Sequence, residues 1–83
     1  MRILYFAWVR ERTGTSEEST TPPASITTAA ALADWLATLS PGHAAAFADR
    51  TRLRLAINQD QAAFTDPIAA NDEIAFFPPM TGG

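Results

Sequence analysis

Hydrophobic positions divide the chain into segments of different period. Residues 3–9 are apolar throughout and rich in strand-forming side chains, which predicts a first strand with at least one buried face. Polar residues follow as far as Gly14, which can end a helical turn in the left-handed conformation. The polar, proline-containing segment 15–25 predicts at most a weak edge strand at residues 17–20.

A helix is predicted to begin after Thr28, whose side chain suits an N-cap. Its apolar residues recur at helical spacing: Ala29, Leu32, Leu36 and Leu39. We expect the Ser-Pro-Gly sequence at residues 40–42 to end the helix, because proline cannot continue its hydrogen bonding. Residues 43–49 can form one further helical turn, and His43 is interpreted as a surface loop residue.

Alternation with period two marks the second half of the chain. Apolar residues spaced by two within residues 50–59 predict a half-buried strand, followed by a turn at residues 58–60. A short strand is expected next. Residues 73–77 alternate again, with Ile74 and Phe76 on one face, and predict a last strand that two prolines end.

These elements predict an α+β domain in which one main helix packs across a mixed sheet. The first and last strands are the most apolar, so we expect them to lie side by side in the middle of the sheet. This is the β-grasp, or ubiquitin-like, arrangement. Residues 1–77 then form the β-grasp domain, and residues 78–83 form an extended functional tail that ends in Gly-Gly.

Composition argues against several classes of function. The 83 residues are enough for one domain, and the net charge of −3 argues against binding to nucleic acid. The chain has no cysteine, no lysine and one histidine, which excludes disulfides, thiolate nucleophiles, Schiff bases and histidine-rich metal sites. No apolar run reaches the ~20 residues that cross a bilayer, so we expect a cytoplasmic protein with no membrane partner.

Most catalytic patterns are missing as well. His43 has no evident serine or acidic partner, and the glycines are too scattered for a phosphate-binding loop. Acidic residues adjoin at positions 17–18 and 72–73. Neighbouring strand residues face opposite sides, so neither pair makes an obvious acid–base dyad. We interpret both pairs as solvated surface acids.

The C-terminal residues carry the remaining candidate chemistry. Pro78 and Pro79 favour an extended course, and Gly82 and Gly83 lack the Cβ that would obstruct a narrow channel. Such a tail can present a bare carboxylate to another protein. Adenylation by ATP would convert that carboxylate into an acyl donor, which a sulfur nucleophile could attack. A frayed terminus without function is the alternative interpretation of the same residues.

Three segments resemble the sulfur-carrier subunits of molybdopterin synthase, a ubiquitin-like family. Residues 72–83, with the sequence DEIAFFPPMTGG, resemble the end of these subunits, and the FFPPxTGG part is specific. Residues 4–14 (LYFA, VRE and a glycine) and residues 56–59 (AINQ) resemble the family too, so the likeness covers nearly the whole chain. Two departures are the polar, proline-rich segment 15–25 and Asn71, which stands where the family often has glycine.

This resemblance implies a β-grasp protein that is not an enzyme by itself but the sulfur-donating subunit of a transferase complex. In the family, an E1-like enzyme uses ATP to adenylate the terminal glycine, which then becomes a thiocarboxylate. The large subunit receives the tail and passes the sulfur to cyclic pyranopterin monophosphate, within a heterotetramer that holds two copies of each subunit. No cofactor is expected to bind to the carrier itself.

The resemblance also implies roles for particular residues. Gly83 is expected to carry the acyl adenylate and then the sulfur. The implied partner-binding residues are Arg10, Phe77, Pro78, Pro79, Met80, Thr81 and Gly82. For Phe77 the alternative is core packing, and for Arg10 it is a solvated surface position.

Three other functions stay open at this point. A sulfur carrier for another pathway, such as thiamine biosynthesis, would share the fold and the Gly-Gly end. A ubiquitin-like modifier would use similar tail chemistry but join the tail to lysines of other proteins. An inert binding domain would keep its activity without Gly83.

Overall fold

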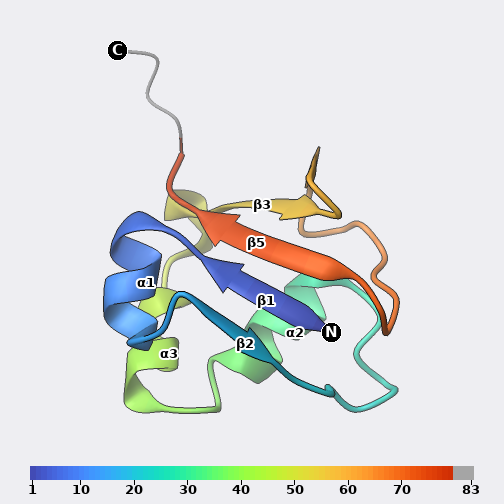
Figure 1. Ribbon diagram of the computed structural model, residues 1–83, viewed down its shortest axis with the longest axis horizontal. Coiled ribbons are helices and arrows are strands. Elements are labelled where there is room, and N and C mark those ends of the chain that lie inside the picture. The colour runs from blue at the N-terminus through green and yellow to red at the C-terminus, as the bar shows by residue number, and fades with distance from the viewer. Residues whose placement is uncertain (80–83) are drawn as a thin grey trace.

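The computed structural model describes residues 1–79 (Figure 1). The tail residues Met80, Thr81, Gly82 and Gly83 lie outside the described residues, and so does the predicted course of the tail. In chain order the elements are β1 (Arg2–Tyr5), α1 (Ala7–Thr13), β2 (Glu17–Ser19), α2 (Ala29–Leu36), α3 (Pro41–Ala46), the 3-10 helix η1 (Arg50–Arg52), β3 (Arg54–Ile57), β4 (Asp60–Ala62) and β5 (Glu73–Phe77).

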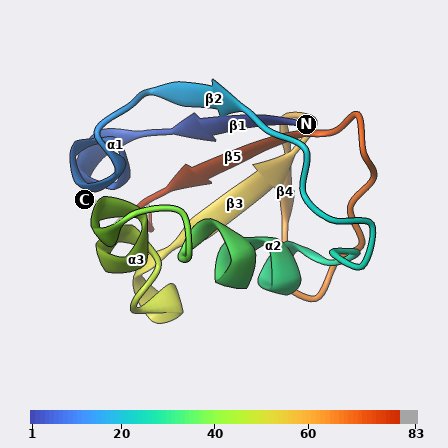
Figure 2. The same ribbon diagram turned by 90° about the horizontal axis from the view of Figure 1, so that it is seen from below.

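The strands form one mixed sheet with the order β2-β1-β5-β3-β4. β1 and β5 pair in parallel, with Ile3 opposite Ile74 and Tyr5 opposite Phe76, whereas the other pairs are antiparallel. Figure 2 shows α2 and α3 on one face of this sheet. The predicted mixed sheet, its neighbouring first and last strands and the helix across it are confirmed. α3 overlaps the further helical turn expected at residues 43–49, whereas α1 and η1 are additional.

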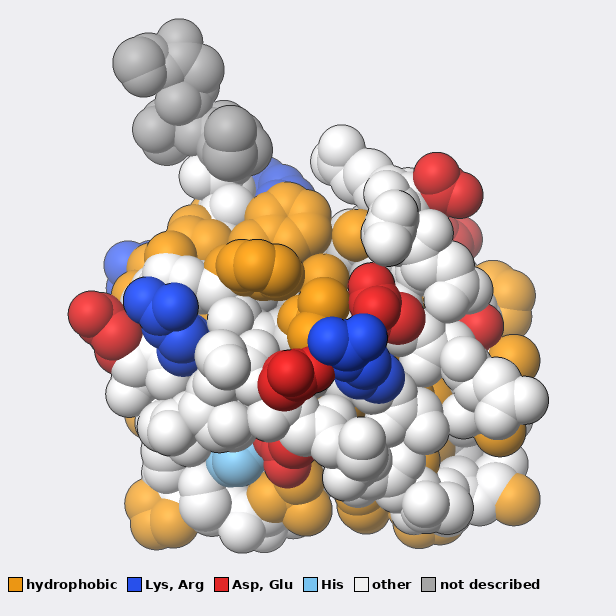
Figure 3. Space-filling view, viewed as in Figure 1, with side chains coloured by type: hydrophobic (Ala, Val, Ile, Leu, Met, Phe, Trp, Pro, Cys, Tyr) orange, Lys and Arg blue, Asp and Glu red, His pale blue; other side chains and the backbone are white. Residues whose placement is uncertain are grey.

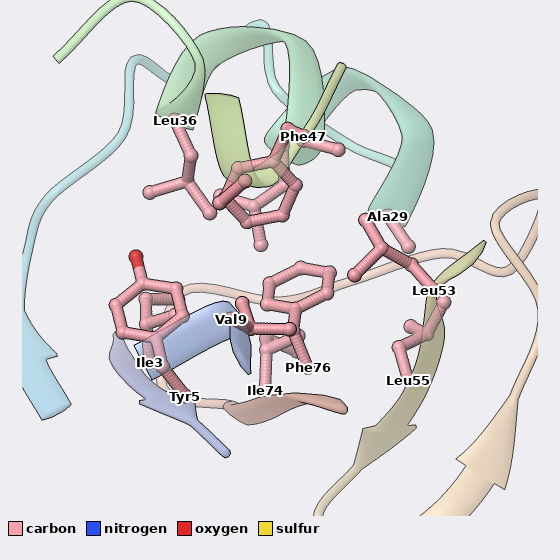
Figure 4. Packing of buried hydrophobic residues seen from close by; sticks show 13 residues of the cluster. Ile3, Tyr5, Val9, Ala29, Leu36, Phe47, Leu53, Leu55, Ile74 and Phe76 are labelled. Atoms are coloured by element: carbon pink, nitrogen blue, oxygen red, sulfur yellow. The ribbon is translucent and has the colours of Figure 1, made fainter. Parts of the chain in front are cut away.

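The core lies between the sheet and the helices (Figure 4). The rings of Phe47 and Phe76 meet edge to face with their centroids 4.8 Å apart, and the Tyr5 ring lies close to both. α2 adds Leu32 and Leu36, which are fully buried. Each large apolar side chain contributes about 1.5–3 kcal/mol by leaving water. A slip of one residue in a strand would turn its buried set outward, so this core also fixes the register of β5.

The first strand was predicted over residues 3–9, and this prediction is wrong beyond Tyr5. α1 begins at Ala7, whose φ of 53° turns the chain out of the strand direction. Val9 is therefore buried from a helix, and Gly14 ends that helix with a φ of 83°. An unbroken apolar run does not distinguish a buried strand from a short buried helix, which explains the error.

The main helix begins as predicted but ends earlier. The Thr28 side chain accepts a hydrogen bond of 3.2 Å from the Ala31 amide and so caps α2. α2 ends at Leu36, which leaves Leu39 41% exposed beyond it. Pro41 occupies the first turn of α3, where its missing N–H leaves no hydrogen bond unmade.

The remaining strands follow the period-two pattern closely. β2 is the expected edge strand, formed within the segment that was predicted to be weakest. β3 begins at Arg54, after η1, because residues 50–52 form a 3-10 turn capped by the Asp49 side chain. Asn58 and Gln59 make the expected turn with positive φ values. In β5 the inward side chains are buried and the outward ones half-buried, as the alternation predicts.

Candidate functional site

The predicted tail begins at the end of β5, the central strand of the sheet. β5 pairs with β1 and with β3, and its last residue, Phe77, lies opposite Arg54. Pro78 and Pro79 follow and are half-buried. Neither proline can donate a hydrogen bond to a neighbouring strand, so pairing stops here. The start of the predicted tail is therefore anchored at the centre of the sheet, within the most constrained part of the fold.

Aromatic side chains surround this starting point on the open face of the sheet. Phe6 is 49% exposed, and its amide donates to the Phe76 carbonyl at 3.1 Å, which places it beside the end of β5. Phe77 points to the side opposite the buried Phe76 and is half-buried. Figure 3 shows hydrophobic side chains gathered near this end of the open face. We call Phe6, Phe77 and Pro78 the tail-root surface.

The sequence identified Phe77 but missed Phe6 as a candidate contact. Within β1, Ile3 and Tyr5 are fully buried, so the residues between and after them point outward. The same alternation, applied to the first residues, would have placed Phe6 on the open face. Residues 3–9 are all apolar, so polarity alone does not show which face Phe6 occupies.

Arg10 lies exposed on α1, which fits both a partner contact and a solvated surface position. The structure brings two other arginines together over the ring of Trp8. The guanidinium carbons of Arg12 and Arg52 lie 5.0 Å and 5.2 Å from its centroid. Residues 8 and 12 are one helical turn apart, whereas Arg10 is two residues from each and faces another direction.

His43 is not a surface loop residue, which corrects that prediction. It lies in α3 and is 7% exposed. Its Nε2 is 2.7 Å from Oε2 of Glu18, and its Nδ1 is 2.7 Å from Oγ of Ser40. Tyr5 donates its hydroxyl to the same Glu18 oxygen at 2.7 Å. Glu18 is therefore not a solvated surface acid, although its neighbour Glu17 is exposed.

The environment of Glu18 acts on its pKa in opposing ways. Desolvation favours the neutral carboxyl, but hydrogen bonds from His43 and Tyr5, together with the charge of His43, outweigh it and lower the pKa. Burial raises the pKa of the Tyr5 phenol, and the bond to Glu18 raises it further. The hydrogen bonds of Glu18 thus join β2 to β1 and α3.

This polar cluster resembles a catalytic triad in composition but not in function. Ser40 is the N-cap of α3, and its hydroxyl oxygen accepts a hydrogen bond of 3.1 Å from the His43 amide. This oxygen therefore stabilises the start of the helix. The histidine faces the serine with Nδ1 and the acid with Nε2, the reverse of the usual arrangement. We assign the cluster to stability.

Two structural findings bound what the domain can do. Within residues 1–79, no group of three or more acidic or histidine side chains is placed to hold a metal ion. None of the helices in that part is both long and apolar enough to span a membrane. The described residues thus offer a rigid platform and an aromatic surface at the start of the tail, which suits presentation of the tail to another protein.

Known proteins are similar to this chain in sequence and in fold. Over 83 residues the chain is 41% identical to the molybdopterin synthase sulfur carrier subunit of Escherichia coli, covering 100% of this chain and 99% of that protein. The protein of the same name from Haemophilus influenzae is 35% identical with the same coverage. These relatives confirm the resemblance drawn from the sequence.

Solved structures agree on the fold. SAMP1 from Haloferax volcanii matches with a TM-score of 0.72 and 26% identity, over 100% of this chain and 98% of that one. A second crystal structure, of the small archaeal modifier protein 1 of the same organism, matches with a TM-score of 0.68. The predicted β-grasp fold is thereby confirmed. Because the sequence profile of the ThiS family matches residues 3–83 and two full-length relatives agree, this chain belongs to the ThiS family.

Proposed function

We propose that this chain is the sulfur carrier subunit of a molybdopterin synthase and that the carboxylate of Gly83 carries the sulfur. The observation that carries the proposal is the 41% identity, over the whole chain, to the Escherichia coli protein of that name. The anchored start of the tail and its aromatic surroundings support it, because a carrier must present its terminus to other proteins. By itself the chain has no catalytic role.

Activation proceeds in two balanced steps. The Gly83 carboxylate attacks the α-phosphorus of ATP on an E1-like enzyme, pyrophosphate leaves, and an acyl adenylate forms. Hydrosulfide then attacks the acyl carbon, the bond from that carbon to the phosphate oxygen breaks, and AMP leaves, which yields the thiocarboxylate. With a persulfide as the sulfur donor, a thiol must also reduce the acyl disulfide that forms. No part of this chemistry needs a side chain of the carrier, in keeping with a chain that has no cysteine.

Sulfur transfer takes place in the large subunit of the synthase. There the thiocarboxylate sulfur attacks an oxygen-bearing carbon of cyclic pyranopterin monophosphate, and the carbon–oxygen bond at that carbon breaks. Water then hydrolyses the acyl–sulfur bond, which leaves the sulfur on the pterin and regenerates the Gly83 carboxylate. Two sulfurs per product require two carrier turnovers, which fits an assembly with two copies of each subunit. We place this assembly in the cytoplasm.

The residues predicted for the partner divide into two groups under this proposal. Met80, Thr81 and Gly82 pass through the partner's channel, where small or flexible side chains are needed. Phe77, Pro78 and Pro79 fix the direction in which the tail leaves, and Phe6 adds an exposed aromatic contact beside them. Arg10 provides a charged contact at the rim of this interface. Exposed aromatics near the centre of an interface commonly dominate its affinity.

A second function is favoured by one observation. One of the similar solved structures is named the small archaeal modifier protein 1 of Haloferax volcanii. The tail could therefore also be joined to lysines of other proteins after the same activation. Higher-mass adducts in extract, lost when Gly83 is deleted, would distinguish this use from sulfur transfer alone.

The mass of the intact chain tests the proposal directly. The purified chain is incubated with its activating enzyme, ATP and a sulfur source, beside a chain lacking Gly83 and a Leu39→Ala control. We expect the wild type and the control to gain the mass difference between sulfur and oxygen, and the truncated chain to gain nothing. Adding the large subunit and the pterin precursor should then consume the modified form. A wild-type chain that never gains this mass would refute the carrier role.

A further inference from the structure

The ring of Trp8 holds two arginines from distant parts of the chain. Arg12 reaches it from α1 and Arg52 from η1, with guanidinium carbons 5.0 Å and 5.2 Å from the ring centroid. The two cations are thus at most 10.2 Å apart, the sum of these distances. Stacking on an indole restricts an arginine without using its N–H groups, which stay directed at the surroundings.

Neither guanidinium has an acidic partner in the part of the chain that the structure describes. The arginines that form ion pairs there are Arg2, with Glu17 and Glu73, and Arg50, with Asp34. Arg12 makes one long contact of 3.5 Å to a backbone carbonyl. Both Arg12 and Arg52 are exposed, and both lie against the same ring. Two like charges are therefore close together, with N–H groups available to an outside acceptor.

The acid nearest to Arg52 is already engaged elsewhere. The Asp49 carboxylate accepts hydrogen bonds from the hydroxyl and the amide of Thr51, at 2.6 Å and 3.0 Å. Hydrogen bonds from Thr51 account for most of its lowered pKa, and the charge of Arg52 adds to the effect. Asp49 caps η1 and does not form an ion pair with Arg52.

This arginine pair lies at the end of the sheet where the tail starts. α1 follows β1, which runs parallel to β5, and η1 precedes β3, whose first residue pairs with Phe77. Charge is segregated along the chain in the same way. Segments 10–12 and 50–54 hold five arginines and one glutamate, whereas the remaining residues hold one arginine and eight acids. A chain of net charge −3 therefore has a basic region beside its tail.

We infer that Arg12 and Arg52, held on Trp8, form a docking site for carboxylate side chains of the activating enzyme, next to the channel that receives the tail. The inference rests on the proposed function. Exposed charges raise association rates more than they raise affinity, and a carrier must meet its activating enzyme, react and leave. The aromatic tail-root surface instead suits the longer-lived complex with the large subunit.

Other anionic partners fit these observations less well. The excess of acids in the rest of the chain would repel the extended phosphate backbone of a nucleic acid. A second copy of the chain could offer acids to the arginine pair, but two copies that each carry a net charge of −3 repel one another. Both alternatives are outcomes that the experiment can detect.

The test compares single neutralisations that change net charge equally. The rate of association with the purified activating enzyme is measured by stopped flow from low to high salt for the wild type, Arg12→Gln, Arg52→Gln and the double variant. Arg2→Gln, at the opposite end of β1, is the control that matches each single variant in charge, whereas the double variant removes one charge more. We expect the double variant to associate about tenfold more slowly at low salt and to lose most of the salt dependence, with Arg2→Gln near the wild type.

Several outcomes would overturn the inference, and they are separable from failure of the proposed function. ATP–pyrophosphate exchange in the presence of the wild-type chain measures adenylation of the carrier. If this exchange is absent, both the proposed function and the docking inference are refuted. With exchange intact, an unchanged association rate in the double variant refutes the docking site alone. Slower binding only to the large subunit, binding to DNA, or salt-sensitive self-association in sedimentation would likewise assign these arginines to another partner. Equal thermal unfolding of the variants confirms that they fold.

Discussion

Nε2 of His43 lies 2.7 Å from Oε2 of Glu18, although 25 residues separate them in the chain. This contact joins α3, in the helical layer, to β2, an edge strand of the sheet. Tyr5 donates to the same oxygen from β1. β2 is an edge strand and pairs on one side only, so a half-buried, hydrogen-bonded carboxylate helps to hold it in place.

The stability of the domain should depend on pH through Glu18. Its pKa is lowered in the folded chain, so it contributes stability above the ordinary glutamate value of 4.5, and this contribution is lost as pH falls below that value. Glu18→Gln should cost about 1 kcal/mol at neutral pH and flatten the acid limb of the stability profile. Urea unfolding between neutral and acid pH measures both effects. Glu17→Gln, which alters an exposed residue paired with Arg2, should leave the acid limb unchanged.

Substitution of Gly42 is predicted to destabilise the fold because there is no room for a Cβ at this position. A Cβ at this position would overlap the backbone carbonyl of Arg12, where α3 packs against α1. In an open helix, alanine would be favoured over glycine by about 1 kcal/mol. Here we expect Gly42→Ala to destabilise the fold by about 1–3 kcal/mol, measured by urea denaturation. A stabilised variant would show that the two helices separate easily.

The tail-root surface should contribute to binding more than to folding. Phe6→Ala and Phe77→Ala should each weaken the complex with the large subunit by more than about 1 kcal/mol, because aromatic side chains near an interface centre act as hot spots. Phe6 is 49% exposed, and Phe77 is half-buried on the open face. Calorimetric titration measures the affinity, and Leu39→Ala, at another exposed hydrophobic residue, is the control. Unchanged affinity together with a large loss of stability in Phe77→Ala would identify that residue as core.

Ala7 is expected to limit stability. Its φ of 53° lies in the left-handed region, which is unfavourable for any residue with a Cβ. Ala7→Gly should therefore raise the free energy of unfolding by about 0.5–1 kcal/mol, despite the greater freedom of glycine in the unfolded chain. Ala45→Gly, in the regular part of α3, should lower it by about the same amount. A loss in both variants would contradict the strain at Ala7.

Much of the fold could be predicted because local patterns agree with it. Thr28 is a true cap, and the alternation in residues 73–77 matches the burial of β5. The break after Tyr5 could not be predicted, since an apolar run fits both a strand and a buried helical turn. Pro41 was interpreted as a stop signal, whereas proline is equally suited to begin a helix.

The candidate site was only partly visible in the sequence. The ending of the chain could be interpreted locally, because extended prolines and bare glycines have the same properties in any fold. The environment of His43 could not, because Glu18 and Tyr5 reach it only after the sheet has formed. The pairing of Arg12 with Arg52 over Trp8 depends in the same way on contacts between distant segments.

The central position of β5 has a consequence for how the protein is made. β1 is translated first and β5 last, yet β5 is the strand that connects β1 to β3. Until β5 has left the ribosome, the β2–β1 pair and the β3–β4 pair cannot be joined into one sheet, and their shared core cannot form. Chains whose synthesis stops early would lack both β5 and the aromatic surface at its end. Because folding is cooperative, chains without β5 would stay unfolded and would not compete with complete carriers for the partner enzymes.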